Sequence, residues 1–189
     1  MAPKTKVTKQ QIVAAGLELA REAGPGAINA RAVARKLNCS TQPVFSNYAA
    51  MDELEKDVLT TASGLYEAHM AAAAQSEKHP PYKAMGLAYI DFARREPELF
   101  RWLFMRDRTG EDIPDGRAEN RQIIRLIADK AGLDEDSAWR FHLEMWLFVH
   151  GVAAMLATGY INWDETQVSD MLTDMFEGLR ARFADKGRK

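Results

Sequence analysis

Apolar residues recur at intervals of three and four along most of the 189-residue chain, which is the period of an amphipathic α-helix. No stretch alternates apolar and polar residues over a useful length, as a half-buried strand would. Apolar residues make up 47% of the chain, which is enough for a folded core. The pattern therefore predicts an all-α protein.

The expected helix boundaries follow from short polar residues and glycine. Thr8 and Gln11 have the spacing of a capping box, and Gly24 can end the helix that they begin. Asn29 and Ser40 can cap two shorter helices. Together with the apolar spacing, these signals predict nine helices, at about residues 9–23, 30–37, 41–48, 50–78, 82–95, 97–105, 117–131, 136–158 and 165–184. Residues 106–116 are expected to form a loop.

The second and third expected helices, separated by a tight turn at Asn38-Cys39, have the arrangement of a helix-turn-helix. Ala34 is small enough for the two helices to approach, while Val44 and Tyr48, four residues apart, would face the core. Hydroxyl, amide and aromatic side chains remain on the other face, where they suit base edges and phosphates. With basic residues nearby, the candidate DNA contacts are Lys4, Lys6, Arg31, Ser40, Thr41, Gln42, Phe45, Ser46 and Asn47. The alternative is a helix-turn-helix that serves only for packing.

Charge is distributed unevenly along the chain, although the net charge is only -2. Residues 1–51 hold seven Lys or Arg against two Asp or Glu, a net charge of +5, and residues 52–189 carry -7. A basic front on an acidic body suggests that the front binds an anion. Chance clustering on a solvated face is the alternative.

The front of the chain resembles the TetR family of repressors. The match runs from Ile12 to Leu54 and includes the stretches AAGLELAREAG, AVARKLNCS and VFSNYAAMDEL in the family's order and spacing. The resemblance implies a DNA-binding domain at residues 1–52 and a ligand-binding and dimerisation domain at residues 53–189. The stretches AYIDFARREPELFRWLF and EMWLFVHGVAAMLATG resemble one TetR subfamily, which is named for its Trp-His-Gly elements, here Trp146, His150 and Gly151.

The chain departs from the family pattern at four positions near the helix-turn-helix. Phe45 stands where the family usually has a Tyr whose hydroxyl contacts phosphate, Tyr48 where it has Phe, and Asn47 where His is common. Met51 replaces a Lys that touches phosphate, and the absence of such a phosphate-binding group weakens DNA binding. Basic residues could compensate for these differences; they are Lys4, Lys6, Lys9 and Arg31.

The last two expected helices, at residues 136–158 and 165–184, are rich in apolar residues. One stripe of the earlier helix carries Ala138, Phe141, Met145, Val149, Val152 and Leu156. The resemblance implies that both helices form the interface of a homodimer, whose two recognition helices would read a palindromic operator. The alternative is that both helices are simply buried within one monomer.

The resemblance also implies release from DNA by a small molecule, and the large, soft side chains of the body favour an apolar or aromatic effector. The candidate contacts are Met85, Tyr89, Phe92, Trp102, Phe104, Met105, Trp139, Trp146 and His150. Core packing is the alternative role for any one of them. His150, which lies in an apolar stretch, could equally be a buried histidine that a neighbour satisfies.

Other classes of protein find little support in the sequence. The four histidines and the single cysteine, Cys39, form no metal or nucleophile motif, and no phosphate-binding glycine loop is present, so we expect neither an enzyme nor a cofactor. Without a signal peptide or a membrane-spanning run, a cytoplasmic location is expected. The sequence thus predicts a TetR-type repressor. The alternative is a helical small-molecule-binding or scaffold protein whose DNA binding is weakened or lost.

Overall fold

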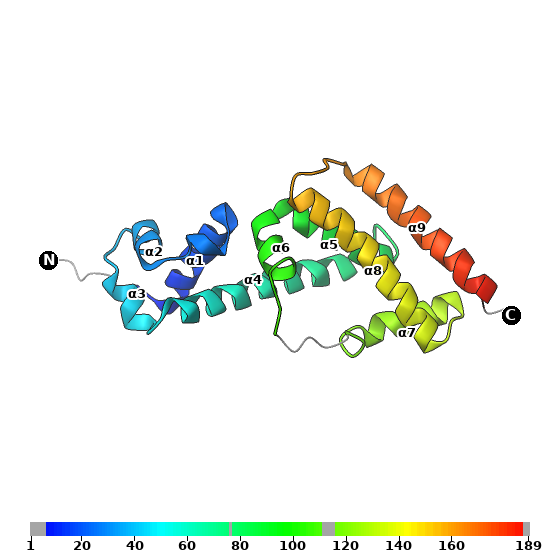
Figure 1. Ribbon diagram of the computed structural model, residues 1–189, viewed down its shortest axis with the longest axis horizontal. Helices are drawn as coiled ribbons and strands as arrows, with labels where there is room; N and C mark the ends of the chain where they lie inside the picture. The colour runs from blue at the N-terminus through cyan, green and yellow to red at the C-terminus, as the bar shows by residue number, and fades with distance from the viewer. Residues whose placement is uncertain (1–6, 76, 111–115, 187–189) are drawn as a thin grey trace. The chain divides into compact units, whose positions relative to one another are not determined.

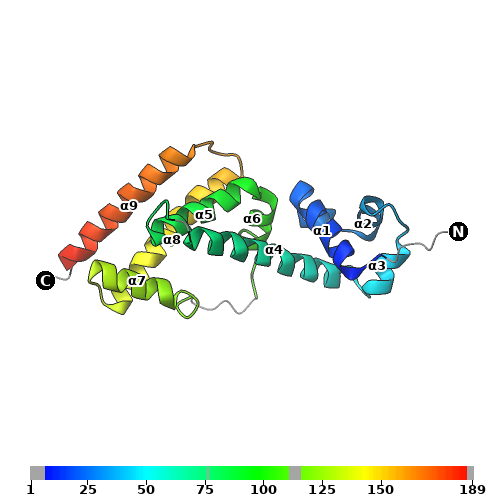
Figure 2. The ribbon, with the colours of Figure 1, turned by 180° about the vertical axis from the view of Figure 1, so that it is seen from behind.

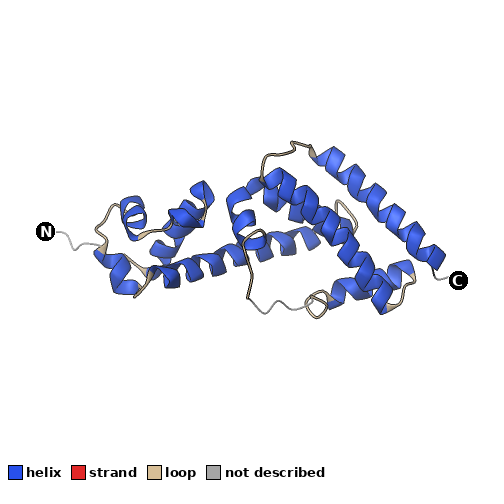
Figure 3. Cartoon of the chain, in the orientation of Figure 1, coloured by secondary structure: helices blue, strands red, loops and turns tan. Residues whose placement is uncertain are grey.

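A computed structural model describes residues 7–75, 77–110 and 116–186 (Figure 1). Within these ranges the chain is helical with no strand, as Figure 3 shows, so the predicted all-α fold is confirmed. The helices are α1 (Lys9–Ala23), α2 (Ala30–Lys36), α3 (Gln42–Asn47), α4 (Met51–Ala74), α5 (Pro81–Arg95), α6 (Pro97–Phe104), α7 (Arg121–Ala131), α8 (Glu135–Ala157) and α9 (Glu165–Lys186).

The predicted caps of α1 and α2 are present. The backbone N–H of Gln11 donates to the side chain of Thr8, and the Gln11 side chain accepts from the Thr8 backbone, which completes the capping box. Gly24 ends α1 with a φ of 77°, a conformation that glycine adopts without strain. Asn29 caps α2 by accepting from the backbone N–H of Ala32 at 2.9 Å.

Three predicted helix boundaries need correction, and one of them is the end of α4, which was expected at residue 78 and lies at Ala74. Ser40 does not cap α3, because the helix begins one residue later, after Thr41, and has no side-chain cap. The helix predicted from residue 117 begins at Arg121, since residues 117–120 form a turn. A 3-10 helix at Pro25–Ala27, which the local sequence signals did not predict, joins α1 to the segment before α2. Residues 106–110 are non-helical as expected, and the rest of the predicted loop up to residue 115 lies outside the described residues.

Contacts within the chain divide it into two compact units. The first unit comprises Met1–His69 and Arg95–Arg106, and the second comprises Met70–Arg94 and Asp107–Lys189. This division reflects packing contacts alone. The predicted division at residue 52 into a DNA-binding domain and a ligand-binding and dimerisation domain stays a prediction.

The first unit packs α1 against α2, α3, α4 and α6. Gly16 allows the close approach of α4, because a Cβ at this position would lie 2.7 Å from Cγ2 of Val58. Phe100 of α6 is fully buried, and Arg21 of α1 donates two hydrogen bonds to the carboxylate of Glu96. The helix-turn-helix therefore rests on α1, and α6 is part of the same packed unit.

The second unit contains α5, α7, α8 and α9, and α9 runs beside α8 in both views (Figures 1 and 2). The ring of Phe141 on α8 contacts those of Phe176 and Phe183 on α9. Gly86 of α5 lies close to both helices, since an added Cβ there would be 3.5 Å from Leu172 and 3.6 Å from Val149. The core of the unit thus lies where these three helices meet.

The prediction of which α8 residues lie at a dimer interface is wrong. The stripe that was expected at a dimer interface is largely buried inside the single chain, with Phe141 at 0% exposure and Met145 at 5%. Phe141 packs on Phe176 and Phe183 of α9, and Val149 lies near Gly86 of α5, so the stripe belongs to the core of the single chain. Among the described residues, no helix combines the length and the apolar character that crossing a membrane requires.

Candidate functional sites

The turn of the helix-turn-helix lies where the sequence predicted it. Asn38 adopts a φ of 51°, in the left-handed region that Asn tolerates better than most residues, and its N–H donates to the carbonyl of Arg35. The N–H of Cys39 donates to the carbonyl of Ala34 at 2.9 Å. These bonds close the end of α2 and turn the chain toward α3.

Helix α3 has one buried and one exposed face, as predicted. Val44 is 0% exposed and Tyr48, which follows the helix, is 3% exposed. Phe45, in contrast, is 58% exposed, and three polar neighbours share its exposure; these are Gln42, Ser46 and Asn47. Of the other candidate DNA contacts, Arg31 and Ser40 are exposed and Thr41 is half-buried, whereas Lys4 and Lys6 lie outside the described residues.

The amide of Asn47 is turned back onto its own helix. Its Nδ2 donates to the carbonyl oxygen of Pro43 at 2.7 Å. Bidentate recognition of adenine requires the amide nitrogen and oxygen together, so Asn47 would have to break this bond to read a base in that way. No side-chain hydrogen bond is present for Gln42 or Ser46 within the described part of the chain.

A network around Asp57 ties α1, α3 and α4 together. The hydroxyl of Tyr48 donates to Oδ2 of Asp57 at 2.9 Å, and Nζ of Lys9 lies 2.7 Å from the same oxygen. Lys9 also lies over the Tyr48 ring, 4.8 Å from its centroid. The hydrogen bonds from Lys9 and Tyr48 hold the pKa of Asp57 below its usual value, and burial together with the Asp57 bond raises the pKa of Tyr48.

Lys9 is therefore engaged in an internal ion pair, although its basic character in the sequence suggested a compensating phosphate contact. Lys36 is also engaged, because its Nζ lies 2.7 Å from Glu22 and 3.2 Å from Glu18. The bond to Glu22 contributes most to raising the pKa of Lys36.

Two arginines of α2 differ from these lysines. Arg31 and Arg35 are exposed, stand four residues apart on one side of the helix, and form no ion pair within the residues that the structure describes. Sequence reasoning named Arg31 and missed Arg35. The i,i+4 spacing was the available signal. Of the basic residues in the described helix-turn-helix, this pair remains available to an external anion.

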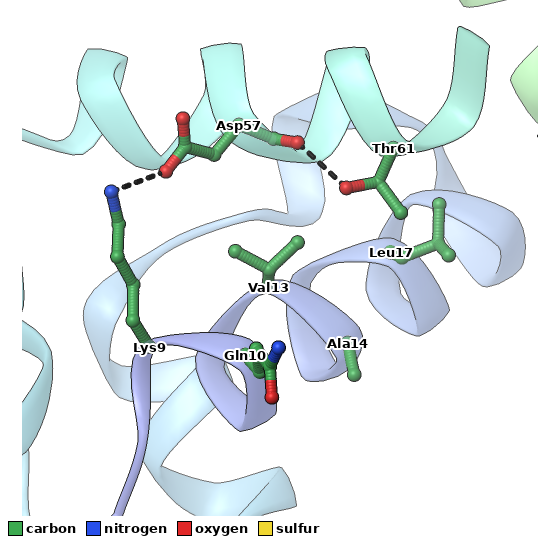
Figure 4. A pocket seen from close by; sticks show the side chains of 7 residues that line it. All are labelled: Lys9, Gln10, Val13, Ala14, Leu17, Asp57 and Thr61. Carbon is green, nitrogen blue, oxygen red and sulfur yellow. Dashed lines mark hydrogen bonds and ion pairs between the residues drawn. The ribbon is translucent and has the colours of Figure 1, made fainter. Parts of the chain in front are cut away.

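A shallow groove of about 410 Å³ lies between α1 and α4 of the first unit (Figure 4). Val13, Ala14 and Leu17 form its apolar side, and the Lys9–Asp57 ion pair closes one end. Thr61 lies at the rim, with its hydroxyl donating to the Asp57 carbonyl at 2.8 Å. None of the predicted effector contacts lines this groove.

The predicted effector contacts are divided between the two units. Trp102, Phe104 and Met105 belong to the first unit, where the Phe104 ring lies 5.1 Å from Phe100 and 4.9 Å from Tyr66 between centroids. Met105 is 42% exposed. The other six residues lie in the second unit; they are Met85, Tyr89, Phe92, Trp139, Trp146 and His150.

The structure brings three of these six together. The Tyr89 hydroxyl and Nδ1 of His150 are 2.9 Å apart, and the His150 ring stacks on Trp146 with centroids 5.3 Å apart. Burial lowers the pKa of His150 below its usual value. His150 is thus half-buried with a hydrogen-bonding neighbour, as the alternative interpretation expected. Phe92 is buried, while Met85 is half-buried.

A second tyrosine–histidine pair was not predicted from the sequence. The Tyr82 hydroxyl lies 3.0 Å from Nδ1 of His142, whose ring is 6.0 Å from that of Trp139. Burial lowers the pKa of His142 and raises that of Tyr82. The pair joins α5 to α8 across 60 residues of sequence, a separation at which local spacing gives no signal.

An apolar stripe remains uncovered on α8. Leu143, Trp146, Leu147 and Met155 are between 36% and 56% exposed. They follow the three-and-four spacing of one helix face, which also carries His150, Gly151 and Ala154. Glu144 lies toward the edge of this face and pairs with Arg182 of α9. Contiguous exposed apolar surface of this kind marks an interaction site more often than free surface.

Comparison with known proteins identifies the fold. Residues 82–179 match a family model described as the tetracycline repressor-like C-terminal domain. The match covers just over half of the chain and runs from α5 through α6, α7 and α8 to most of α9. The chain therefore belongs to the TetR-like family of regulators. No curated protein matches it.

Proposed function

We propose that the protein is a DNA-binding transcriptional repressor of the TetR type, which acts as a homodimer on a palindromic operator. The observation that supports this most is the exposed face of α3, where Gln42, Phe45 and Ser46 stand outside the packed core of the helix-turn-helix. Arg31 and Arg35 on the adjacent helix supply positive charge without internal ion pairs among the described residues. A base-reading face beside a phosphate-binding pair is what such a module needs.

The proposed dimer uses the uncovered stripe of α8. One recognition helix reads too few bases for a specific site, whereas two helices related by a twofold axis read both halves of a palindrome. Leu143, Leu147 and Met155 supply the apolar surface that such an interface requires. The proposed subfamily assignment rests on the Trp-His-Gly elements, Trp146, His150 and Gly151, which share this stripe.

A small apolar or aromatic effector would release the proposed repressor from DNA. Bound effector lowers DNA affinity only if it favours a state in which the two recognition helices no longer match the half-site spacing. The proposed effector contacts in the second unit are Met85, Tyr89, Phe92, Trp139, Trp146 and His150. We propose no catalytic role and no cofactor.

Binding to labelled duplex DNA tests the proposal. The duplex carries the intergenic sequence upstream of the protein's own gene, and binding is measured at two salt concentrations in the presence of excess nonspecific competitor. We expect saturable binding that survives the competitor and weakens as salt rises. Absence of specific binding here and in a genome-wide selection would contradict the proposal.

The alternative is a helical small-molecule-binding or scaffold protein with weakened or lost DNA binding. It is favoured by the internal ion pairs of Lys9 and Lys36 and by Met51, which replaces a phosphate-contacting Lys of the family pattern. The same binding experiment separates the two functions, because only the repressor selects one sequence over its competitors.

A further inference from the structure

Phe45 is a large aromatic side chain that lies exposed on α3 and does not help to pack this helix against its unit. Helix α3 is held to its unit by Val44 and Tyr48, at 0% and 3% exposure, whereas Phe45 is 58% exposed. Its neighbours on the exposed face, Gln42 and Ser46, are polar. An isolated exposed aromatic is ordinary on most surfaces, but this one stands in the middle of the proposed base-reading face.

The chemistry of Phe45 restricts what it can contact on DNA. It has no hydroxyl, so it cannot donate to a phosphate as the tyrosine of the family pattern can. The edges of the bases in the major groove present donors and acceptors, and the one apolar group among them is the C5-methyl of thymine. A phenyl ring at the groove floor therefore has a single complementary partner among the four bases.

Several other polar side chains of the helix-turn-helix and its neighbourhood are bonded within the protein, so fewer of them can contact DNA. Asn47 donates its amide nitrogen to Pro43 at 2.7 Å, which turns it away from bidentate pairing with adenine. Lys9 and Lys36 are engaged with Asp57 and with Glu22. Because these two described lysines are engaged, apolar contact supplies a larger share of the affinity than it would if both bound phosphate.

Resting on the proposed repressor function, we propose that Phe45 is a specificity-determining residue that packs its ring on the methyl group of a thymine in each operator half-site. The contact replaces the tyrosine–phosphate bond of the family pattern with a base contact. It favours A·T over G·C at one position of each half-site, and it does so without a hydrogen bond.

Methyl deletion in the DNA tests the inference. The operator is first selected from random duplexes with the purified full-length protein, and each thymine is then replaced singly by deoxyuridine, which removes only the methyl group. Burial of one methyl is worth about fourfold in binding, so we expect one position per half-site at which deoxyuridine weakens binding by about that factor. The same replacement in both half-sites should weaken it by about 15-fold.

Protein variants assign the methyl effect to Phe45. In Phe45→Ala the penalty for deoxyuridine at that position should disappear, while Ser46→Ala, a matched change on the same exposed face, should retain it. Both residues are exposed, and unchanged melting temperatures would confirm that both variants fold.

The possible results are distinguishable. A selected operator that binds equally well with every thymine replaced overturns the inference and leaves the repressor function intact, with Phe45 then packing on sugar or facing solvent. A methyl penalty that persists in Phe45→Ala also overturns it. Selection of no sequence at all overturns the proposed function and the inference with it.

Discussion

The hydroxyl of Tyr48 donates to Oδ2 of Asp57 at 2.9 Å, across nine residues of sequence and between the end of α3 and α4. The TetR pattern usually has phenylalanine where Tyr48 stands, so this bond is a feature of the present chain. Lys9 meets the same oxygen from α1. One carboxylate thereby links three helices of the first unit.

Removing the Tyr48 hydroxyl should cost stability without changing the fold. Tyr48→Phe keeps the buried ring and deletes one hydrogen bond, so we expect the free energy of unfolding to fall by about 1 kcal/mol. Chemical denaturation followed by circular dichroism measures it. Tyr160→Phe is the matched control, because Tyr160 is 80% exposed, and its stability should be unchanged. Equal effects of the two substitutions would contradict the structural role of the Tyr48–Asp57 bond.

Two helical glycines should respond to alanine in opposite ways. A Cβ at Gly16 of α1 would lie 2.7 Å from Cγ2 of Val58, whose branched side chain has little freedom to yield, so Gly16→Ala should destabilise the protein by about 1–3 kcal/mol. Gly64 of α4 has nothing within 4 Å of an added Cβ among the described residues. Gly64→Ala should raise stability by about 0.5–1 kcal/mol, since alanine favours the helix. Denaturation midpoints that shift in the same direction for both variants would contradict the close packing of α1 on α4.

The sequence predicted the helices well because caps and apolar spacing are local signals. Thr8 with Gln11 and Asn29 act where they were expected. The start of α3 was misplaced by one residue, because Ser40 and Thr41 are both acceptable caps and the structure uses neither side chain. Local sequence signals therefore predicted which segments are helical better than they predicted the first residue of α3.

Long-range pairing is what the sequence could not supply. Helix α8 is apolar on two faces, and the spacing of Phe141 and Met145 is no different from that of Leu143 and Leu147. Which face is covered depends on α5 and α9, which are distant in sequence. Lys9 and Asp57, 48 positions apart, give no local sign of their ion pair. For the same reason the cations available to DNA could not be distinguished from those engaged internally.

Arg31 and Arg35 should account for much of the salt dependence of DNA binding. Replacing both with alanine should reduce the slope of log binding constant against log salt by about 0.9 for each phosphate that the variant no longer neutralises. Lys36→Gln is the control on the same helix, because Lys36 is paired with Glu22 and Glu18, and it should change the slope less. Fluorescence anisotropy at several salt concentrations measures both. A larger effect from Lys36→Gln would reassign the phosphate-binding role.

His142 should make stability depend on pH near neutrality. Burial lowers its pKa below the usual 6.5, so the unfolded chain binds a proton that the folded chain excludes. The penalty is absent above about pH 6.5 and grows as pH falls from there toward the lowered folded-state pKa. We expect the melting temperature of the wild-type protein to fall from pH 7.5 to pH 5.5, and to fall less in His142→Gln. The same decrease in both proteins would show that other groups are responsible.

Leu147 should be the most sensitive position of the proposed dimer interface, because it is the most exposed of the large apolar residues on α8, at 56%. Leu147→Asp would place a carboxylate in a desolvated interface, where an unpaired charge costs several kcal/mol, so the dimer should dissociate to monomers. Tyr160→Asp makes the same chemical change at a residue that is more exposed but lies beyond the end of α8, and it should remain dimeric. Sedimentation equilibrium gives the mass of each variant. If Leu147→Asp remained a dimer, the interface would lie elsewhere. If the wild-type protein were itself a monomer, the uncovered stripe would bind another partner, and the proposal that two recognition helices read a palindromic operator would be contradicted.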